Sequence, residues 1–136
     1  MINFIVCEDN KIILQKNIDI INKTMFKNNI NYRIYQFTNS DSKLKELINE
    51  NKELKIYILD IELETTSGID IARDIRKKDN KSIIIISTTY MEYLPYALKN
   101  KLMLFDFVSK FEDYEENLSN VINKAIEQLK EQNMLV

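Results

Sequence analysis

The amino-acid sequence predicts an α/β protein built on a doubly wound, five-stranded parallel sheet. Five short apolar runs alternate along the chain with longer segments of helical spacing. Some of the runs are apolar almost throughout, as expected of strands that helices cover on both faces. A regular alternation of strand and helix favours parallel strands joined by right-handed crossovers.

The expected strands are rich in branched and aromatic residues. The runs at 2–7, 55–60 and 82–88 are nearly continuous in apolar character, which indicates burial on both faces. The runs at 31–37 and 104–109 are more mixed in polarity but also have the length of strands.

Apolar stripes at helical spacing lie between and after these runs. The stripe residues are Leu14, Ile18, Ile21 and Met25; Leu44, Leu47 and Ile48; Ile71, Ala72 and Ile75; and Leu118, Val121, Ile122, Ala125 and Leu129. We expect Asn39 or Ser40 to cap the second helix, and Asp113 with Glu116 to form a capping pair for the last one. The segment 91–101 is the weakest helix, with Pro95 in its first turn.

The composition limits the classes of function. The 136 residues fit one domain; they are 45% hydrophobic and 29% charged, with a net charge of −2. The single cysteine, Cys7, is expected in the core, and the absence of histidine excludes Cys/His metal sites. One glycine is too few for a Walker or Rossmann phosphate loop. No signal peptide or membrane-spanning run is present, and we expect a cytoplasmic protein.

Polar side chains follow four of the expected strands where each strand ends. They are Glu8 and Asp9 after the first strand, Asp60 after the third, Ser87, Thr88 and Thr89 at the end of the fourth, and Ser109 and Lys110 at the end of the fifth. Taken singly, each fits a helix cap or a solvated surface position. Their conjunction at one edge, where open α/β sheets bind ligands, favours a functional site.

Three carboxylates at one point repel each other unless a cation binds between them. Mg²⁺ is the natural cation, since it takes carboxylates, waters and phosphate oxygens as ligands. Lys110 would then pair with a phosphoryl oxygen, and Thr88 would hydrogen-bond another. One carboxylate remains to attack phosphorus and form an acyl phosphate.

This pattern resembles the receiver domain of two-component response regulators over essentially the whole chain. The resemblance implies a flavodoxin-like (βα)5 fold with strand order 2-1-3-4-5. It implies that Glu8 and Asp9 bind Mg²⁺, that Asp60 is the phosphoacceptor and Mg²⁺ ligand, and that the backbone carbonyl of Glu62 completes the metal site. Thr88, 22 residues before Lys110, matches the family spacing for the hydroxyl residue, whereas Ser87 and Thr89 do not.

Of the other family positions, Gly68 also matches, and some others depart from the family. Gly68, eight residues after Asp60, is expected to enter the third helix at a φ that other residues avoid. Phe107 takes the place of the switch aromatic, with a role in the core as the equal alternative. Phe111 stands where relatives have a proline after the lysine. Glu62 and Tyr90 are expected to tune hydrolysis of the acyl phosphate.

The segments FIVCEDN, LDIELETTSGIDIARDIRKKD, IIIIST and FDFVSK look similar to the accessory-gene-regulator and LytTR subgroup. The resemblance implies a sensor histidine kinase as phosphodonor, transcription as output, and DNA contact only through the protein's own C-terminal DNA-binding domain. A homodimer through the face of the fourth helix, fifth strand and fifth helix is plausible. We expect 1–136 to be a single receiver domain, a fragment or stand-alone, with no output domain before Val136.

Two alternatives stay open from the sequence. The segment LDIELET is weakly similar to the D-x-D-x-T signature of haloacid-dehalogenase-like phosphatases, although that family places its nucleophile on the first strand. Turnover of many phosphates per molecule would identify such an enzyme. The other alternative is a receiver-like interaction module that is never phosphorylated. The leading expectation is a phosphoacceptor signalling domain that is not an enzyme in the ordinary sense. It would catalyse only its own Mg²⁺-dependent phosphorylation and dephosphorylation.

Overall fold

Five parallel strands form one sheet at the centre of the protein. A computed structural model describes residues 1–89, 92, 95, 101–132 and 134–135. The strands are β1 (Ile2–Cys7), β2 (Tyr32–Phe37), β3 (Leu54–Leu59), β4 (Ile83–Thr88) and β5 (Asp106–Ser109), in the order β2-β1-β3-β4-β5. This order and the parallel pairing confirm the predicted doubly wound, flavodoxin-like fold.

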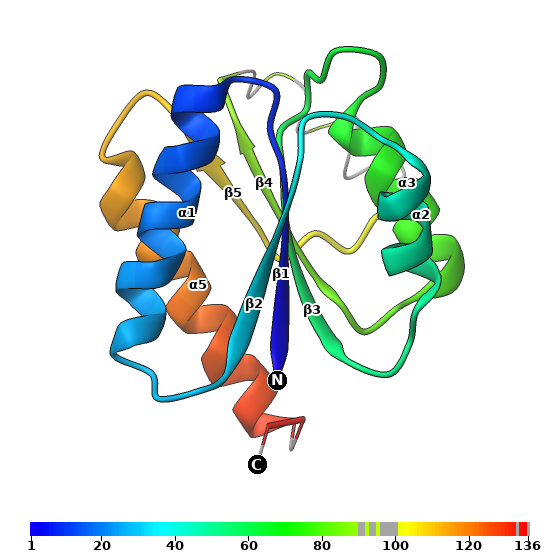
Figure 1. Ribbon diagram of the computed structural model, residues 1–136. Helices are drawn as coiled ribbons and strands as arrows, with labels where there is room; N and C mark the ends of the chain where they lie inside the picture. Colours follow the sequence, from blue (N-terminus) through cyan, green and yellow to red (C-terminus); the bar gives the residue numbers. More distant parts are fainter. Residues whose placement is uncertain (90–91, 93–94, 96–100, 133, 136) are drawn as a thin grey trace.

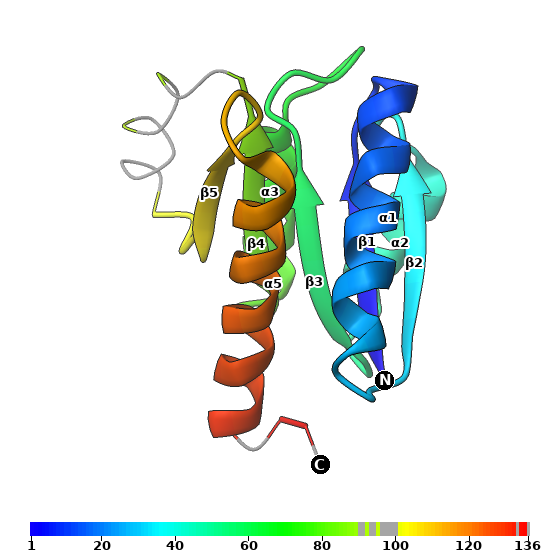
Figure 2. The same ribbon diagram turned by 90° about the vertical axis from the view of Figure 1, so that its left-hand side faces the viewer.

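Helices cover both faces of the sheet (Figure 1). On one face lie α1 (Lys11–Phe26) and α5 (Tyr114–Glu131), and on the other lie α2 (Ser42–Asn49) and α3 (Gly68–Lys78), as the perpendicular view in Figure 2 also shows. The helix expected over 91–101 falls largely outside the described residues. Within the described part of the chain, no helix has the length and apolar character to cross a membrane.

The apolar residues of the central strands are buried in two hydrophobic clusters, one on each face of the sheet. Side chains alternate across a strand, so Ile83 and Ile85 join the apolar cluster under α1 and α5, while Ile84 and Ile86 join the cluster under α2 and α3. All four are buried, and each contributes on the order of 1.5–3 kcal/mol of transfer free energy. A strand with a helix layer on each side buries both of its faces, so it does not alternate apolar and polar residues as a half-exposed strand does.

Side-chain caps set where the helices begin. The Asn10 side-chain oxygen accepts hydrogen bonds from the backbone N–H groups of Ile12 and Ile13, at 3.0 and 3.1 Å, and so starts α1. Ser67 caps α3 in the same way, accepting from the N–H of Ile69 at 3.0 Å. With these caps α1 begins at Lys11, shortly after β1, whereas α3 begins at Gly68, after the longer loop that follows β3.

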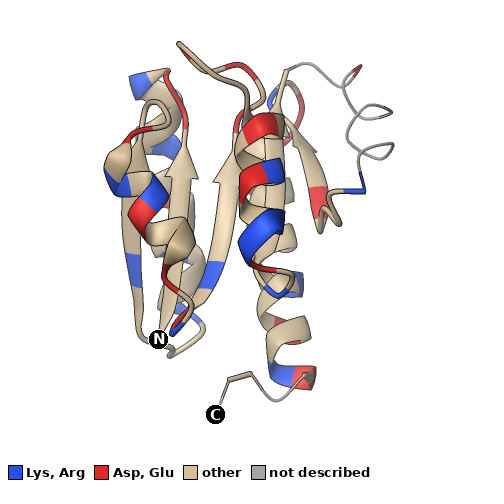
Figure 3. Cartoon of the chain, turned by 90° about the vertical axis from the view of Figure 1, so that its right-hand side faces the viewer, with Lys and Arg blue, Asp and Glu red and all other residues tan. Residues whose placement is uncertain are grey.

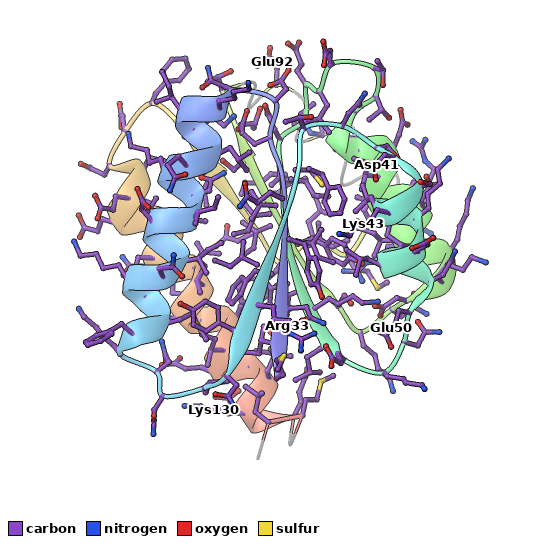
Figure 4. The ribbon with its side chains drawn as sticks, viewed as in Figure 1. Arg33, Asp41, Lys43, Glu50, Glu92 and Lys130 are labelled. Carbon is purple, nitrogen blue, oxygen red and sulfur yellow. The ribbon has the colours of Figure 1, made fainter. Side chains whose placement is uncertain are left out.

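The expected caps of two helices are wrong. Asp41, labelled in Figure 4 at the start of α2, caps that helix by accepting from the N–H of Leu44 at 2.9 Å. The Asn39 amide hydrogen-bonds Thr65 across the neighbouring loop instead. Asp113 does precede α5, but its backbone is left-handed, with φ 48° and ψ 40°, and its side chain makes no capping bond. A cap needs extended backbone to bring its oxygen back over the first turn, so the sequence spacing with Glu116 was not sufficient.

A candidate phosphoacceptor and metal site

Acidic side chains gather at the carboxyl ends of the strands. Because all five strands are parallel, their carboxyl ends lie at the same end of the molecule, and Figure 3 shows several acidic segments on the loops there. Glu92, labelled in Figure 4, lies at this end as well. Strand order explains the meeting of the site acids, because β1 and β3 are hydrogen-bonded neighbours although more than 45 residues separate them.

Glu8, Asp9 and Asp60 form one carboxylate cluster. Each offers an oxygen, and these three oxygens lie within 4.8 Å of one another. Glu8 and Asp60 are buried, whereas Asp9 is exposed. The backbone fixes the two loops together, since the N–H of Asp60 donates to the carbonyl of Cys7 at 3.0 Å. Carboxylate oxygens are the ligands that hard divalent cations take, so this donor set fits Mg²⁺.

Lys110 supplies the positive charge of the site. Its ammonium group hydrogen-bonds one oxygen of Glu8 and lies 3.1 Å from Oδ2 of Asp60. The lysine side chain is only 7% exposed, so water screens these ion pairs little. One ammonium group against three carboxylates leaves an excess of negative charge, which a divalent cation would neutralise.

Thr88 lies at the same edge of the sheet. It is the last residue of β4 and fully buried, and its carbonyl accepts a hydrogen bond from the N–H of Lys110 at 3.1 Å. Ser87, the alternative hydroxyl in the sequence, bonds Tyr114 of α5 at 2.6 Å. The Ser87 hydroxyl is thus bonded to the helix layer of α1 and α5, which supports the choice of Thr88 as the hydroxyl residue of the site.

Gly68 is required by a close approach and not by its backbone angle. The expectation of an unusual φ is wrong, because no glycine has a positive φ. A Cβ at Gly68 would lie 2.0 Å from the carbonyl oxygen of Asp60 and 2.8 Å from its carbonyl carbon. The N–H of Gly68 also donates to the carbonyl of Ile61 at 2.9 Å. The absence of a side chain therefore lets α3 begin against the backbone that carries Asp60.

The family of the chain follows from a direct match. The model of the response regulator receiver domain family matches residues 4–123, which is most of the chain. The chain belongs to this family. Receiver domains are signalling domains of two-component systems, so the match favours neither a phosphatase nor any other class of enzyme.

Solved structures of similar fold are known. A response regulator receiver domain protein from Clostridium thermocellum is 23% identical, with 96% of this chain and 98% of that chain covered and a TM-score of 0.76. A LuxR-family DNA-binding response regulator from Staphylococcus aureus is 28% identical, with coverages of 91% and 98% and a TM-score of 0.68. The response regulator TrrA from Thermotoga maritima, solved with Mg²⁺–BeF, is 24% identical, with coverages of 95% and 99% and a TM-score of 0.64. No curated protein sequence matches this chain.

Two other expected site residues lie within the described part of the chain. Glu62 is exposed in the loop after Asp60, where its backbone forms an isolated bridge with Ser67. Phe107 is half-buried on β5 and packs against the cluster under α2 and α3. Tyr90, expected to act with Glu62, lies outside the described residues.

Burial changes the acidity of Glu8. Desolvation raises the pKa of Glu8 from its ordinary value of 4.5 to about 7, while the hydrogen bond and charge of Lys110 act in the opposite direction. The lysine therefore compensates only part of the cost of burying this carboxylate. Cys7, one residue earlier, is buried as predicted, and burial raises the pKa of its thiol to about 12.

Without metal, this receiver domain should lose stability as the pH rises from about 4.5 to 7. Folded Glu8 keeps a proton in this window that the unfolded chain releases, so deprotonation favours the unfolded state. Urea unfolding in EDTA at several pH values should show the wild type losing about 1–3 kcal/mol relative to Glu8→Gln, which has no proton to lose there. Parallel stability curves for the two proteins would contradict this origin of the shift.

The sequence did not reveal the buried partners of Ser87. Tyr114 and Asn17 complete a chain of hydrogen bonds with Ser87 between β4, α5 and α1. A serine at the end of an otherwise apolar buried strand was a usable signal, because a buried hydroxyl requires a partner. The identity of that partner was not readable, since the three residues lie far apart in the chain.

Proposed function

We propose that this receiver domain accepts a phosphoryl group on Asp60 from the phosphohistidine of a sensor histidine kinase. An oxygen of the Asp60 carboxylate attacks phosphorus, an O–P bond forms, and the P–N bond to the histidine breaks. The imidazole leaves with the electron pair and takes a proton. Asp60 suits this role because it directly follows the central strand β3, next to Glu8 and Asp9 in the carboxylate cluster, and its Oδ2 lies 3.1 Å from the Lys110 ammonium group.

Mg²⁺ would be held by Glu8, Asp9 and Asp60, with the backbone carbonyl of Glu62 as a further ligand. The carboxylate cluster supports this assignment, because hard cations select such oxygen donors. The TrrA structure with Mg²⁺–BeF adds support from a protein of the same fold. When bound, the cation supplies charge neutralisation for the phosphoryl oxygens.

Lys110 would change partners during the reaction. In the structure its ammonium group contacts Glu8 and Asp60. Lys110 would pair as a point charge with a phosphoryl oxygen on Asp60, whose Oδ2 lies 3.1 Å from its ammonium group. Thr88 would hydrogen-bond another phosphoryl oxygen, and Phe107 would respond to its movement as the switch aromatic.

The output we propose is control of transcription. The sequence segments similar to the accessory-gene-regulator and LytTR subgroup favour it, and so does the similarity to a DNA-binding response regulator. DNA contact would then belong to a C-terminal output domain of the full protein, with 1–136 as its receiver domain. Phosphorylation adds nearly two negative charges at Asp60 and would shift an output face that includes β5 and α5, through which the protein would dimerise.

The observation that carries this proposal is the close cluster of three carboxylates and a buried lysine at the carboxyl edge of the sheet. Incubation with acetyl phosphate and Mg²⁺, followed by intact mass spectrometry, should show one added phosphoryl group per chain. The same incubation in EDTA should show almost none. Equal uptake with and without Mg²⁺, or no uptake at all, would refute the proposed chemistry.

A further inference from the structure

A buried chain of three polar side chains runs beside the site. The Oγ of Ser87 on β4 lies 2.6 Å from the hydroxyl oxygen of Tyr114 on α5. The same tyrosine hydroxyl donates to the side-chain oxygen of Asn17 on α1. Ser87 and Asn17 are each 1% exposed and Tyr114 is 7% exposed. Polar groups buried this deeply must be paired, so the chain fixes its three elements relative to one another.

The direction of the bonds follows from the number of protons. Tyr114 has one hydroxyl proton, which it donates to Asn17, so it accepts from Ser87. Burial raises the pKa of Tyr114, and the nearby charges of Glu8 and Asp60 raise it further. The phenol therefore keeps its proton at neutral pH, and the order Ser87 to Tyr114 to Asn17 is maintained.

This chain of hydrogen bonds ends at Ser87, the residue before Thr88 on β4. One peptide bond joins Ser87 to Thr88, and the carbonyl of Thr88 accepts from the N–H of Lys110 at 3.1 Å. Holding Ser87 therefore holds the backbone that carries Thr88 and, through it, the start of the Lys110 segment. Asp60 directly follows Leu59, the last residue of the neighbouring strand β3, which pairs with Ile86, so Asp60 lies level with Ser87.

We propose that Tyr114 and Ser87 are positioning residues for phosphoryl transfer at Asp60. Through its hydrogen bond with Ser87, Tyr114 holds the end of β4 in the position from which Thr88 would hydrogen-bond the phosphoryl group. This inference rests on the proposed function. Neither residue touches the reacting atoms, so their loss should slow the reaction without removing it, whereas misplacement of a group by about 1 Å commonly costs large factors in rate.

The molecule contains a matched control for this inference. Thr24 of α1 and Ser119 of α5 share a hydrogen bond of 2.8 Å between their hydroxyl oxygens. This bond also ties α1 to α5, but no described bond of either side chain reaches β4. Thr24→Val therefore measures the effect of removing a hydrogen bond between the two helices. Ser87→Ala instead removes the hydrogen bond between β4 and Tyr114 and leaves the bond from Tyr114 to Asn17 in place.

The test measures the initial rate of phosphoryl uptake from acetyl phosphate at saturating Mg²⁺, by intact mass. Ser87→Ala and Tyr114→Phe should each react about three- to tenfold more slowly than wild type, and the double variant no more slowly than Tyr114→Phe, since both act through one chain. The Kd for Mg²⁺ should change less than about twofold, because the proposed ligands follow β1 and β3 and not β4. Thr24→Val should react at the wild-type rate.

Specific results would overturn the inference. Wild-type rates in both Ser87→Ala and Tyr114→Phe would show that the chain does not position the site. A loss in Thr24→Val equal to that in Ser87→Ala would show a general effect of looser packing. If wild type itself takes up no phosphoryl group, the proposed function fails and the inference falls with it; if wild type reacts and the variants match it, the inference alone fails.

Discussion

Replacing Asp60 with asparagine should abolish phosphoryl uptake from acetyl phosphate. The amide has nearly the shape of the carboxylate but lacks the anionic oxygen that attacks phosphorus. The change also removes one of the three carboxylates of the cluster and the partner that lies 3.1 Å from the lysine ammonium group. We expect intact mass spectrometry to show no phosphorylated species above background for this variant, against nearly complete conversion of the wild type.

A second aspartate in the same region provides the control. Asp70 is exposed in the first turn of α3 and pairs with Arg73 at 2.8 Å, on the surface of the helix. Asp70→Asn removes the same charge from the chain and should leave uptake within about twofold of wild type, because exposed ion pairs contribute little. Uptake by Asp60→Asn at a rate comparable to that of Asp70→Asn would show that another residue accepts the phosphoryl group.

Replacing Gly68 with alanine should destabilise the protein, against the usual preference of helices. In an exposed helix interior this change stabilises by up to about 1 kcal/mol. Here the new Cβ would meet the Asp60 carbonyl oxygen at 2.0 Å, a contact with backbone that no side-chain rotation can relieve. We expect a loss of about 2 kcal/mol or more in urea unfolding, and a slower phosphoryl uptake, since the clash pushes the segment that carries Asp60.

Asp70→Ala separates the clash from general effects on α3. It lies two residues further along the same first turn, where its side chain is exposed. This variant should unfold within about 0.5 kcal/mol of wild type, because surface changes of this kind are usually small. A stabilised Gly68→Ala protein would contradict the close approach between α3 and the loop after β3.

The fold was predictable because the apolar pattern is a direct consequence of layered packing. Runs such as 82–88 are apolar on both faces only if helices cover both, and that leaves few alternatives to a parallel sheet. The meeting of Glu8 with Asp60 was likewise expected, since parallel strands present their carboxyl ends at one edge. Both inferences use periodicity and topology, which a single sequence contains.

Other features depend on distances that a sequence does not contain. The wrong reason for Gly68 is one example, because close approach and unusual φ leave the same glycine in the sequence. Arg76 is another: its guanidinium group at the end of α3 donates to the backbone carbonyls of Leu102 and Met103, at 2.8 and 3.0 Å. Carbonyl acceptors belong to every residue, so no side-chain pattern marks such a partner.

The ion pair between Lys110 and Glu8 could not be predicted from the positions of the strand ends alone. Lys110 was expected to await a phosphoryl oxygen, yet in the structure it hydrogen-bonds Glu8 and lies close to Asp60. A buried ammonium group is stabilised by the negative charges nearest to it, which here are Glu8 and Asp60. The sequence contains the groups of the site, whereas their pairing depends on distances between them.

The most direct test is to locate the phosphoryl group within the protein. After reaction with acetyl phosphate and Mg²⁺, the acyl phosphate can be trapped by borohydride reduction and mapped by fragmentation mass spectrometry. Acceptance of the group by the carboxylate that Lys110 contacts on β3 predicts a reduced residue at position 60 and at no other. A trapped residue at Glu8 or Asp9, or a phosphate that resists reduction and maps to a hydroxyl side chain, would contradict it.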